Sequence, residues 1–197
     1  IWYDQSGNAR NLIKTDYNLQ PQIVFNGAFK YIGTKVAIDF SGNKGLVYSG
    51  SLSLASINTV VRSESTIWPN YHTILEGSPR IGGILETVGT TFHSNVYPLA
   101  IWKNGISKAS NETLAPVNEG MVLSISPQTN NINQIFIGNY DGGGSGRRAG
   151  AADLYDHDGD YITSWDLNDR ADRSDLMTRN FIWYDIVSID KTVNVVS

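Results

Sequence analysis

Short runs of apolar or alternating residues, each about five residues long, dominate the chain and are separated by polar turns. Runs of this length, often about 8–12 residues apart, are typical of strands in a β-sandwich or a barrel. The pattern therefore predicts an all-β domain. The expected strands lie at residues 22–25, 37–40, 45–49, 58–62, 72–75, 81–86, 99–102, 121–125, 134–137, 181–189 and 192–196.

Turn-forming pairs stand between these runs. Asn26-Gly27 and Asn104-Gly105 can supply the positive φ angles that a tight hairpin turn requires. Residues 102–106 therefore predict a strand, an Asn-Gly turn and a second strand. Gly42-Asn43 and Gly82-Gly83 are further turn candidates.

The helical signal is weak and is confined to residues 167–177, where Asp166 is a candidate N-cap. These residues belong to a glycine-rich and then charged stretch, residues 141–179. Long irregular stretches inside a compact domain are usually functional or disordered. We predict one domain over residues 1–197, in which residues 141–179 form an insertion before the closing strand and build a specificity surface at one edge.

Composition narrows the functional classes. The net charge is −4 and only 17% of the residues are charged, which argues against a nucleic-acid partner, because such proteins normally present a basic face. The absence of cysteine excludes thiol catalysis, zinc–thiolate sites and disulfides. No apolar run approaches the roughly 18 residues of a membrane span. The chain begins Ile1-Trp2-Tyr3, which we interpret as a piece of a larger polypeptide.

The opening residues 2–8, with the sequence Trp-Tyr-Asp-Gln-Ser-Gly-Asn, form the most specific motif. The Asp and Ser side chains can cap backbone N–H groups, and Gly7 or Asn8 can take the left-handed conformation. The motif resembles the entry strand and turn of laminin-G-like, concanavalin A-like lectin/glucanase domains. Ser41 departs from that family's Ala-x-x-Phe-Asp-Gly step, where Asp is usual. Further similar segments follow in family order at residues 21–23, 26–27, 37–42, 73–77, 101–105, 135–138 and 182–185.

The resemblance implies a jelly roll of two curved antiparallel sheets. The same fold serves lectins, adhesion modules, glycan-binding modules of tail and fibre proteins, and glycoside hydrolases or lyases, so function has to be argued from a site. Glucanases of this fold carry a Glu-x-Asp-x-x-Glu strand, and the chain has none. Glu76 and Glu86 could meet across a hairpin at Gly82-Gly83 as a catalytic pair. The alternative is that both are ordinary surface carboxylates.

Two groups of residues suit ligand binding. Asp156, Asp158 and Asp160 alternate and offer the oxygen ligands that Ca²⁺ prefers, although the spacing is not that of an EF-hand. The other interpretation is a solvated acidic loop balanced by arginines. Sugar rings stack on aromatic side chains, and arginine binds acidic groups on glycans. Candidate glycan-binding residues outside the expected strands, or beside the insertion, are Trp68, Tyr71, Tyr140, Arg147, Arg148, Tyr155, Tyr161 and Trp165.

These observations predict a non-catalytic carbohydrate-binding or adhesion module of a larger surface or virion protein, such as a phage tail protein, acting outside the cell. Its partner would be a cell-surface or extracellular glycan, with Ca²⁺ as a candidate cofactor. Two alternatives stay open. One is a polysaccharide-cleaving hydrolase or lyase that uses Glu76 and Glu86, and the other is a purely structural or protein-binding laminin-G-like domain.

Overall fold

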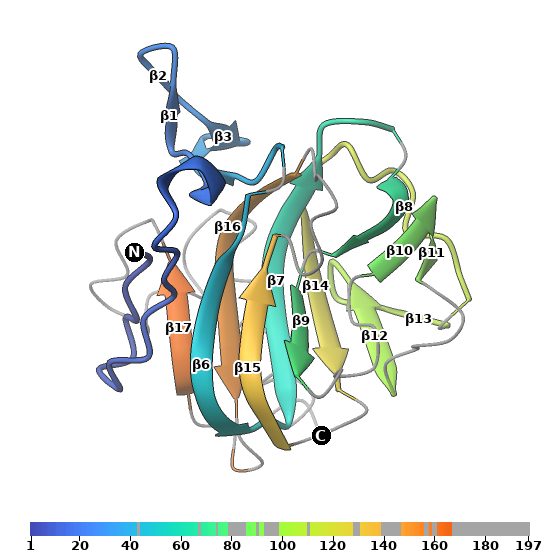
Figure 1. Ribbon diagram of the computed structural model, residues 1–197. Helices are drawn as coiled ribbons and strands as arrows, with labels where there is room; N and C mark the ends of the chain where they lie inside the picture. The colour runs from blue at the N-terminus through green and yellow to red at the C-terminus, as the bar shows by residue number, and fades with distance from the viewer. Residues whose placement is uncertain are drawn as a thin grey trace.

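Antiparallel strands make up nearly all of the regular structure in the computed structural model of the protein (Figure 1). The structure describes residues 1–42, 44–66, 68–73, 75–78, 86–89, 91–92, 99–109, 111–127, 131–138, 147–155, 158 and 161–166. Within these residues the one helical element is a 3-10 turn, η1 (Tyr17–Leu19). The predicted all-β class is confirmed. No helix in this part of the chain has the length and apolar character needed to cross a membrane.

The largest sheet has seven strands, and β7 and β16 lie near its middle. Its main path runs β13 (Ile106–Lys108), β12 (Ala100–Lys103), β14 (Met121–Ser126), β7 (Ser56–Ser63), β16 (Arg147–Tyr155) and β17 (Tyr161–Asp166). The seventh strand, β5 (Ile38–Asp39), pairs with β16.

The remaining strands form four smaller sheets. One contains β6 (Leu46–Ser53), β15 (Asn131–Ile137) and β9 (Leu75–Ser78). A second contains β11 (Thr91–Phe92), β10 (Glu86–Gly89) and β8 (Trp68–Thr73). Two short hairpins complete the set, β1 (Val24–Phe25) with β2 (Ala28–Phe29), and β3 (Tyr31–Ile32) with β4 (Lys35–Val36).

The main hydrophobic core lies between the seven-stranded sheet and the sheet of β6, β15 and β9 (Figure 1). Register explains which residues enter it. Ile57 on β7 is opposite Ile125 on β14 and Leu154 on β16, so the three side chains share one face of the sheet. The facing sheet contributes Ile135 and Ile137 from β15. Burial of such aliphatic side chains is the dominant stabilising term.

Both Asn-Gly turns fold as predicted. Asn26 and Gly27 have φ angles of +51° and +77°, and Asn104 and Gly105 have φ angles of +50° and +79°. Two consecutive positive φ angles define the type I′ turn, whose twist matches that of the flanking strands. Each pair therefore closes a two-residue hairpin, β1–β2 in the first case and β12–β13 in the second.

The end of β15 meets the segment that follows β5. Gly138, at the end of β15, has a φ angle of +92°, which favours glycine. A Cβ atom there would lie 2.2 Å from the ring of Phe40 and 2.6 Å from the carbonyl oxygen of Lys44. The glycine thus allows the Phe40 ring to pack against the backbone where β15 ends.

The stretch expected as an insertion is not an irregular loop over residues 147–155 and 161–166, which form β16 and β17 of the largest sheet. β16 pairs with β7 along most of its length and shares Ala152 and Leu154 with the core. The sequence of β16, Arg-Arg-Ala-Gly-Ala-Ala-Asp-Leu-Tyr, contains few large apolar residues, so the hydrophobic pattern was too weak to indicate a strand. Residues 141–146 and 167–179, with the helix expected at 167–177, lie outside the described residues, as do the strands expected at 181–189 and 192–196.

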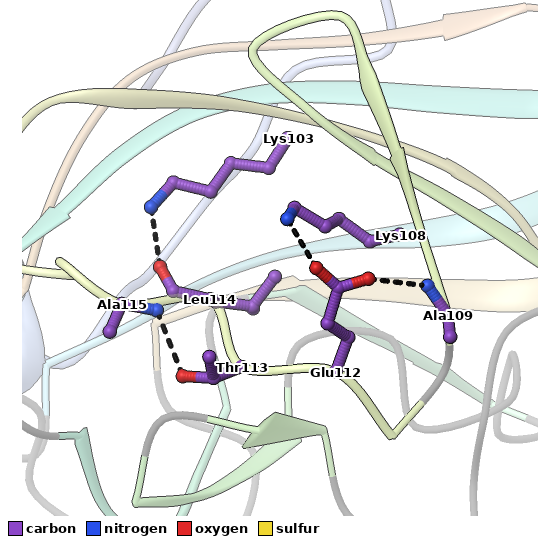
Figure 2. Close-up of polar contacts among 7 residues, drawn as sticks. All are labelled: Lys103, Lys108, Ala109, Glu112, Thr113, Leu114 and Ala115. Carbon is purple, nitrogen blue, oxygen red and sulfur yellow. Dashed lines mark hydrogen bonds and ion pairs between the residues drawn. The ribbon is translucent and has the colours of Figure 1, made fainter.

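A buried lysine fixes the loop that follows β13. The Lys103 side chain is 9% exposed, and its Nζ donates hydrogen bonds to the carbonyl oxygens of Leu114 at 2.5 Å and Pro116 at 2.9 Å. In the same loop, Glu112 accepts from Lys108 and from the Ala109 backbone N–H (Figure 2). Burial lowers the pKa of Lys103, and nearby Glu119 partly offsets this.

This burial predicts a pH dependence of stability. The pKa of Lys103 is lower in the folded protein than its usual 10.5, so the unfolded chain binds more protons in the interval between the two values. The free energy of unfolding of the wild type, measured by urea titration relative to Lys103→Met, should therefore rise with pH through this interval. If the difference in free energy of unfolding between the wild type and Lys103→Met stays constant or falls with pH, the lowered pKa of the buried Lys103 is contradicted.

The position of Trp165 gives a second prediction. Its side chain is fully buried, and its Nε1 donates to the carbonyl oxygen of Arg10 at 2.8 Å. Truncating a buried tryptophan to alanine costs about 3–5 kcal/mol, and each kcal/mol shifts the thermal midpoint by about 2–4 °C at this chain length. We expect Trp165→Ala to lower the midpoint by about 6–20 °C.

The matched control is Tyr17→Ala, because the Tyr17 side chain is 83% exposed. An exposed substitution should change stability by no more than about 0.5 kcal/mol. An unchanged melting temperature for Trp165→Ala would contradict the burial of the Trp165 side chain.

Candidate functional site

Asp4 organises the turn of the opening motif. Its carboxylate accepts hydrogen bonds from the Ser6 backbone N–H at 2.9 Å, the Ser6 hydroxyl at 2.8 Å and the Arg10 backbone N–H at 3.1 Å. Gly7 has a φ angle of +86°, as predicted for this motif, and Ala9 rather than Asn8 takes the second left-handed position, at +56°. Residues 4–10 therefore form a closed loop that sends the chain back beside its own start.

The returning segment links the two main sheets. Leu12 exchanges two backbone hydrogen bonds of 2.9 Å with Trp2, and Ile13 exchanges two with Val47 of β6, at 2.8 and 2.9 Å. On the other side, Asp4 forms a β-bridge with Trp165 of β17. The N-terminal segment therefore lies between the edge of the larger sheet and the edge of the β6 sheet.

A hollow of about 420 Å³ opens between this segment and β6. Its walls mix apolar side chains, hydroxyl groups, one amide and one ammonium group. Among the lining residues, Lys14 is the only one that carries a charge at neutral pH. The lining residues are Ala9, Asn11, Ile13, Lys14, Thr15, Val47, Tyr48 and Ser49.

Hydrogen bonds to neighbours fix how these polar groups are presented. The Asn11 Oδ1 accepts from the Asp4 backbone N–H at 2.9 Å, which orients the amide and leaves its two Nδ2 protons available to a ligand. The Ser49 hydroxyl accepts from Gln134 Nε2 at 3.1 Å and retains its own proton as a donor. The hollow thus offers several donors around a single positive charge.

Tyr48 forms the aromatic wall, and Gly50 allows its position. The ring packs against the hydrophobic core on one side and is only partly buried. A Cβ atom on Gly50 would lie 2.3 Å from the Tyr48 hydroxyl oxygen and 2.6 Å from the ring carbon that bears it. A glycine at this position therefore lets the ring lie across the β6 backbone.

The residues selected from the sequence lie elsewhere. Arg147, Arg148 and Tyr155 belong to β16 and Tyr161 to β17, so the structure places their backbones in the largest sheet and not in an irregular loop. The expectation that Trp165 is an exposed stacking residue is wrong, because its side chain belongs to the core. Tyr140, Asp156 and Asp160 lie outside the described residues, and Asp158 is exposed in a turn.

Trp68 and Tyr71 were expected in a loop because Pro69 stands between them, and the structure corrects this. They belong to β8, which pairs with β10 alone among the described strands. Proline lacks a backbone donor and is tolerated on an edge strand, where one side of the backbone has no partner strand.

The alternative catalytic pair is not brought together by a hairpin. Glu76 lies on β9, which pairs with β15, whereas Glu86 lies on β10 opposite Thr73 of β8. The Glu76 side chain is 1% exposed and accepts from the Gly77 backbone N–H at 2.8 Å. β9 and β10 are therefore not the two arms of one hairpin, and Gly82-Gly83 lie outside the described residues. Among the described residues, no group of three His, Asp or Glu side chains is placed to hold a metal ion.

A second polar cluster lies on the face of the largest sheet that points away from the core. Asn58 and Ser124 are register partners there, and Trp102 is opposite Ser124 on the next strand. The Asn58 and Ser124 side chains are 1% and 3% exposed, so neither can meet a large ligand in this conformation. The hollow is the better candidate because its donors are open to solvent.

Sequence reasoning missed the hollow, although one signal was present. Asn11 and Leu12 follow the opening turn, and the half-buried Lys14 and the exposed Thr15 beyond them are polar. The other wall comes from residues 47–49, and only the pairing of Ile13 with Val47 brings the two segments together.

Comparison with known proteins returned no match: no protein family, curated protein or solved structure is similar enough to this chain to be matched. The hollow and its chemistry are therefore the observations on which a function has to rest.

The contact between Gly50 and Tyr48 is directly testable. In Gly50→Ala the new methyl group overlaps the far end of the Tyr48 side chain, so the ring should swing out of its place beside the hollow. Because the colliding atoms belong to a movable side chain, we expect the fold to persist while a crystal structure of the variant shows a different Tyr48 rotamer. An unchanged rotamer would show that Gly50 does not govern the aromatic wall.

Proposed function

We propose that this domain is a non-catalytic glycan-binding module and that its hollow binds a saccharide carrying an acidic group. The observation that carries the proposal is the lining of the hollow. One ammonium group stands among neutral hydrogen-bond donors, apolar side chains and an aromatic ring, and no lining residue is acidic.

Each part of such a saccharide has a complement in the hollow. The carboxylate of a uronic acid, or a sulfate, would pair with the Lys14 ammonium group. Sugar hydroxyls would bond to the Asn11 amide and to the hydroxyls of Thr15 and Ser49, because these groups donate and accept hydrogen bonds. The apolar face of a sugar ring would lie against Tyr48.

The size of the hollow sets the scale of the ligand. Sites for small ligands usually measure about 300–1,000 Å³, and 420 Å³ lies in the lower part of that range. A short unit within a longer glycan fits this volume. A single small site of this kind favours weak binding, which becomes effective on a surface when several copies act together.

The wider context of the proposal comes from the resemblance. The two sheets that enclose the core would be the layers of a concanavalin A-like jelly roll, and the domain would belong to a larger surface or virion protein outside the cell. The hydrolase or lyase alternative loses its main support, because the strands of Glu76 and Glu86 belong to different sheets. The alternative is a structural or protein-binding role. The absence of binding to any glycan would favour that alternative.

The test compares acidic with neutral oligosaccharides by array and by calorimetry. A charge-assisted hydrogen bond contributes about 1.5–3 kcal/mol, so Lys14→Met should weaken binding of a uronic acid oligosaccharide by about tenfold or more. Lys14→Arg should retain most of the affinity. Lys35→Met, which removes the same charge from a segment that does not line the hollow, is the matched control.

Equal affinity of the wild type for charged and neutral sugars would overturn the acidic specificity. Unaltered binding by Lys14→Met would remove the hollow as the site. Release of reducing ends from a polysaccharide would show that the domain is an enzyme.

A further inference from the structure

A hairpin arm, residues 21–36, lies at one end of the domain; β1 and β2 project from the body, whereas Ile32 on β3 is buried (Figure 1). Within it, β1 and β2 form a sheet of two strands and pair with no other described strand. The arm is attached at its base, where Gln22 and Asp39 exchange two backbone hydrogen bonds and the Lys30 ammonium lies 3.3 Å from the Asp39 carboxylate.

The arm exposes aromatic and aliphatic side chains on both faces. Val24 is opposite Phe29 on one face, and the Phe29 ring meets the Tyr31 ring edge-on at 6.5 Å. Phe25 lies on the other face, with the Lys30 ammonium 4.8 Å from its ring centre. The exposed fractions are Ile23 37%, Val24 46%, Phe25 49%, Phe29 53% and Tyr31 42%.

An apolar surface of this size requires an explanation. A buried aromatic side chain covers about 150–250 Å², so three rings that are about half exposed leave about 300 Å² of ring surface in water, divided between the two faces of the arm. The largest apolar patch on a monomeric protein is typically about 300–600 Å² and is often a binding site. A two-stranded hairpin is also marginally stable by itself, so contact with a partner would stabilise the arm.

A complementary surface lies at the opposite end of the domain (Figure 1). β13 is the last strand of the seven-stranded sheet, and one side of its backbone has no partner among the described strands. Ile106 on β13 is 64% exposed, and Leu99, just before β12, is 70% exposed. We name the open side of β13 with these two residues the β13 edge.

Charge favours a second copy of the chain as the partner. The arm contains Lys30 and Lys35 and no acidic residue, which leaves 13 basic against 19 acidic residues, a net charge of −6, in the rest of the chain. On β13 itself Lys108 is paired with Glu112, and the exposed Glu119 is close enough to Lys103 of β12 to act on its pKa. The arm is thus basic and apolar, and the rest of the chain that it would meet is acidic overall.

We propose that the arm of one copy docks on the β13 edge of the next, so that copies associate head to tail. Strand addition would satisfy the open backbone groups of β13, as when an extended segment joins an exposed sheet edge. Such a contact uses different surfaces on the two partners, so it builds rings or open chains. The inference does not depend on the hollow, although repeated copies would multiply weak glycan contacts.

The test measures molar mass by light scattering at protein concentrations up to about 1 mM, a range that detects dissociation constants in the micromolar region. An arm variant combines Phe25→Ser with Phe29→Ser, and an edge variant carries Ile106→Lys, because a charged side chain blocks edge pairing. Tyr17→Ser, which changes an exposed aromatic outside both surfaces, is the control. Since all altered residues are exposed, thermal midpoints should stay close to that of the wild type.

We expect the mass of the wild type and of Tyr17→Ser to rise with concentration, and each of the other two variants to stay monomeric. A mixture of the arm variant with the edge variant should stop at a dimer, because each partner then keeps one working surface. A wild type that is monomeric throughout would overturn the proposal. Association that needs the arm but tolerates Ile106→Lys would replace it with arm-to-arm pairing. Binding of the monomer to anionic phospholipid vesicles through the arm would identify a membrane as the occupant instead.

Discussion

The geometry of the N-terminal region depends on the hydrogen bonds that the Asp4 carboxylate accepts. By accepting three hydrogen bonds from Ser6 and Arg10, it closes the turn that returns the chain beside Trp2. That return brings the Arg10 carbonyl oxygen to the Trp165 indole and places Ile13 against Val47. The hollow exists because one short segment is held at both sheet edges. A carboxylate that accepts several hydrogen bonds is well suited to this role, because each bond is charge-assisted.

Local features of the fold were predictable because their causes are local. The Asn-Gly turns follow from backbone sterics at two residues, and the capping by Asp4 and Ser6 follows from side chains two positions apart. The alternation of apolar residues likewise located β6, β7, β14 and β15 to within a few residues. These predictions needed no knowledge of the partner strands.

Features that depend on distant partners were not predictable. β16 contributes Ala152 and Leu154 to the core, and its place beside β7 is set by pairing with a segment far earlier in the sequence. Trp165 looked like a loop aromatic because its hydrogen-bond partner, Arg10, is 155 residues earlier. The hollow was missed for the same reason, since its two walls come from separate segments. The binding site predicted from aromatic and charged residues in expected loops therefore fell in part on residues of β8, β16 and β17.

The central claim is that ligand recognition takes place in the hollow between residues 9–15 and β6. The most direct measurement is nuclear magnetic resonance of the ¹⁵N-labelled domain during titration with a uronic acid oligosaccharide. The account predicts that the largest shifts occur at the Asn11 side-chain amide, whose Nδ2 protons are available to a ligand, and at the backbone amides of Lys14 and Ser49. Shifts confined to residues 68–71 or 155–161, with the Asn11 amide unchanged, would contradict it.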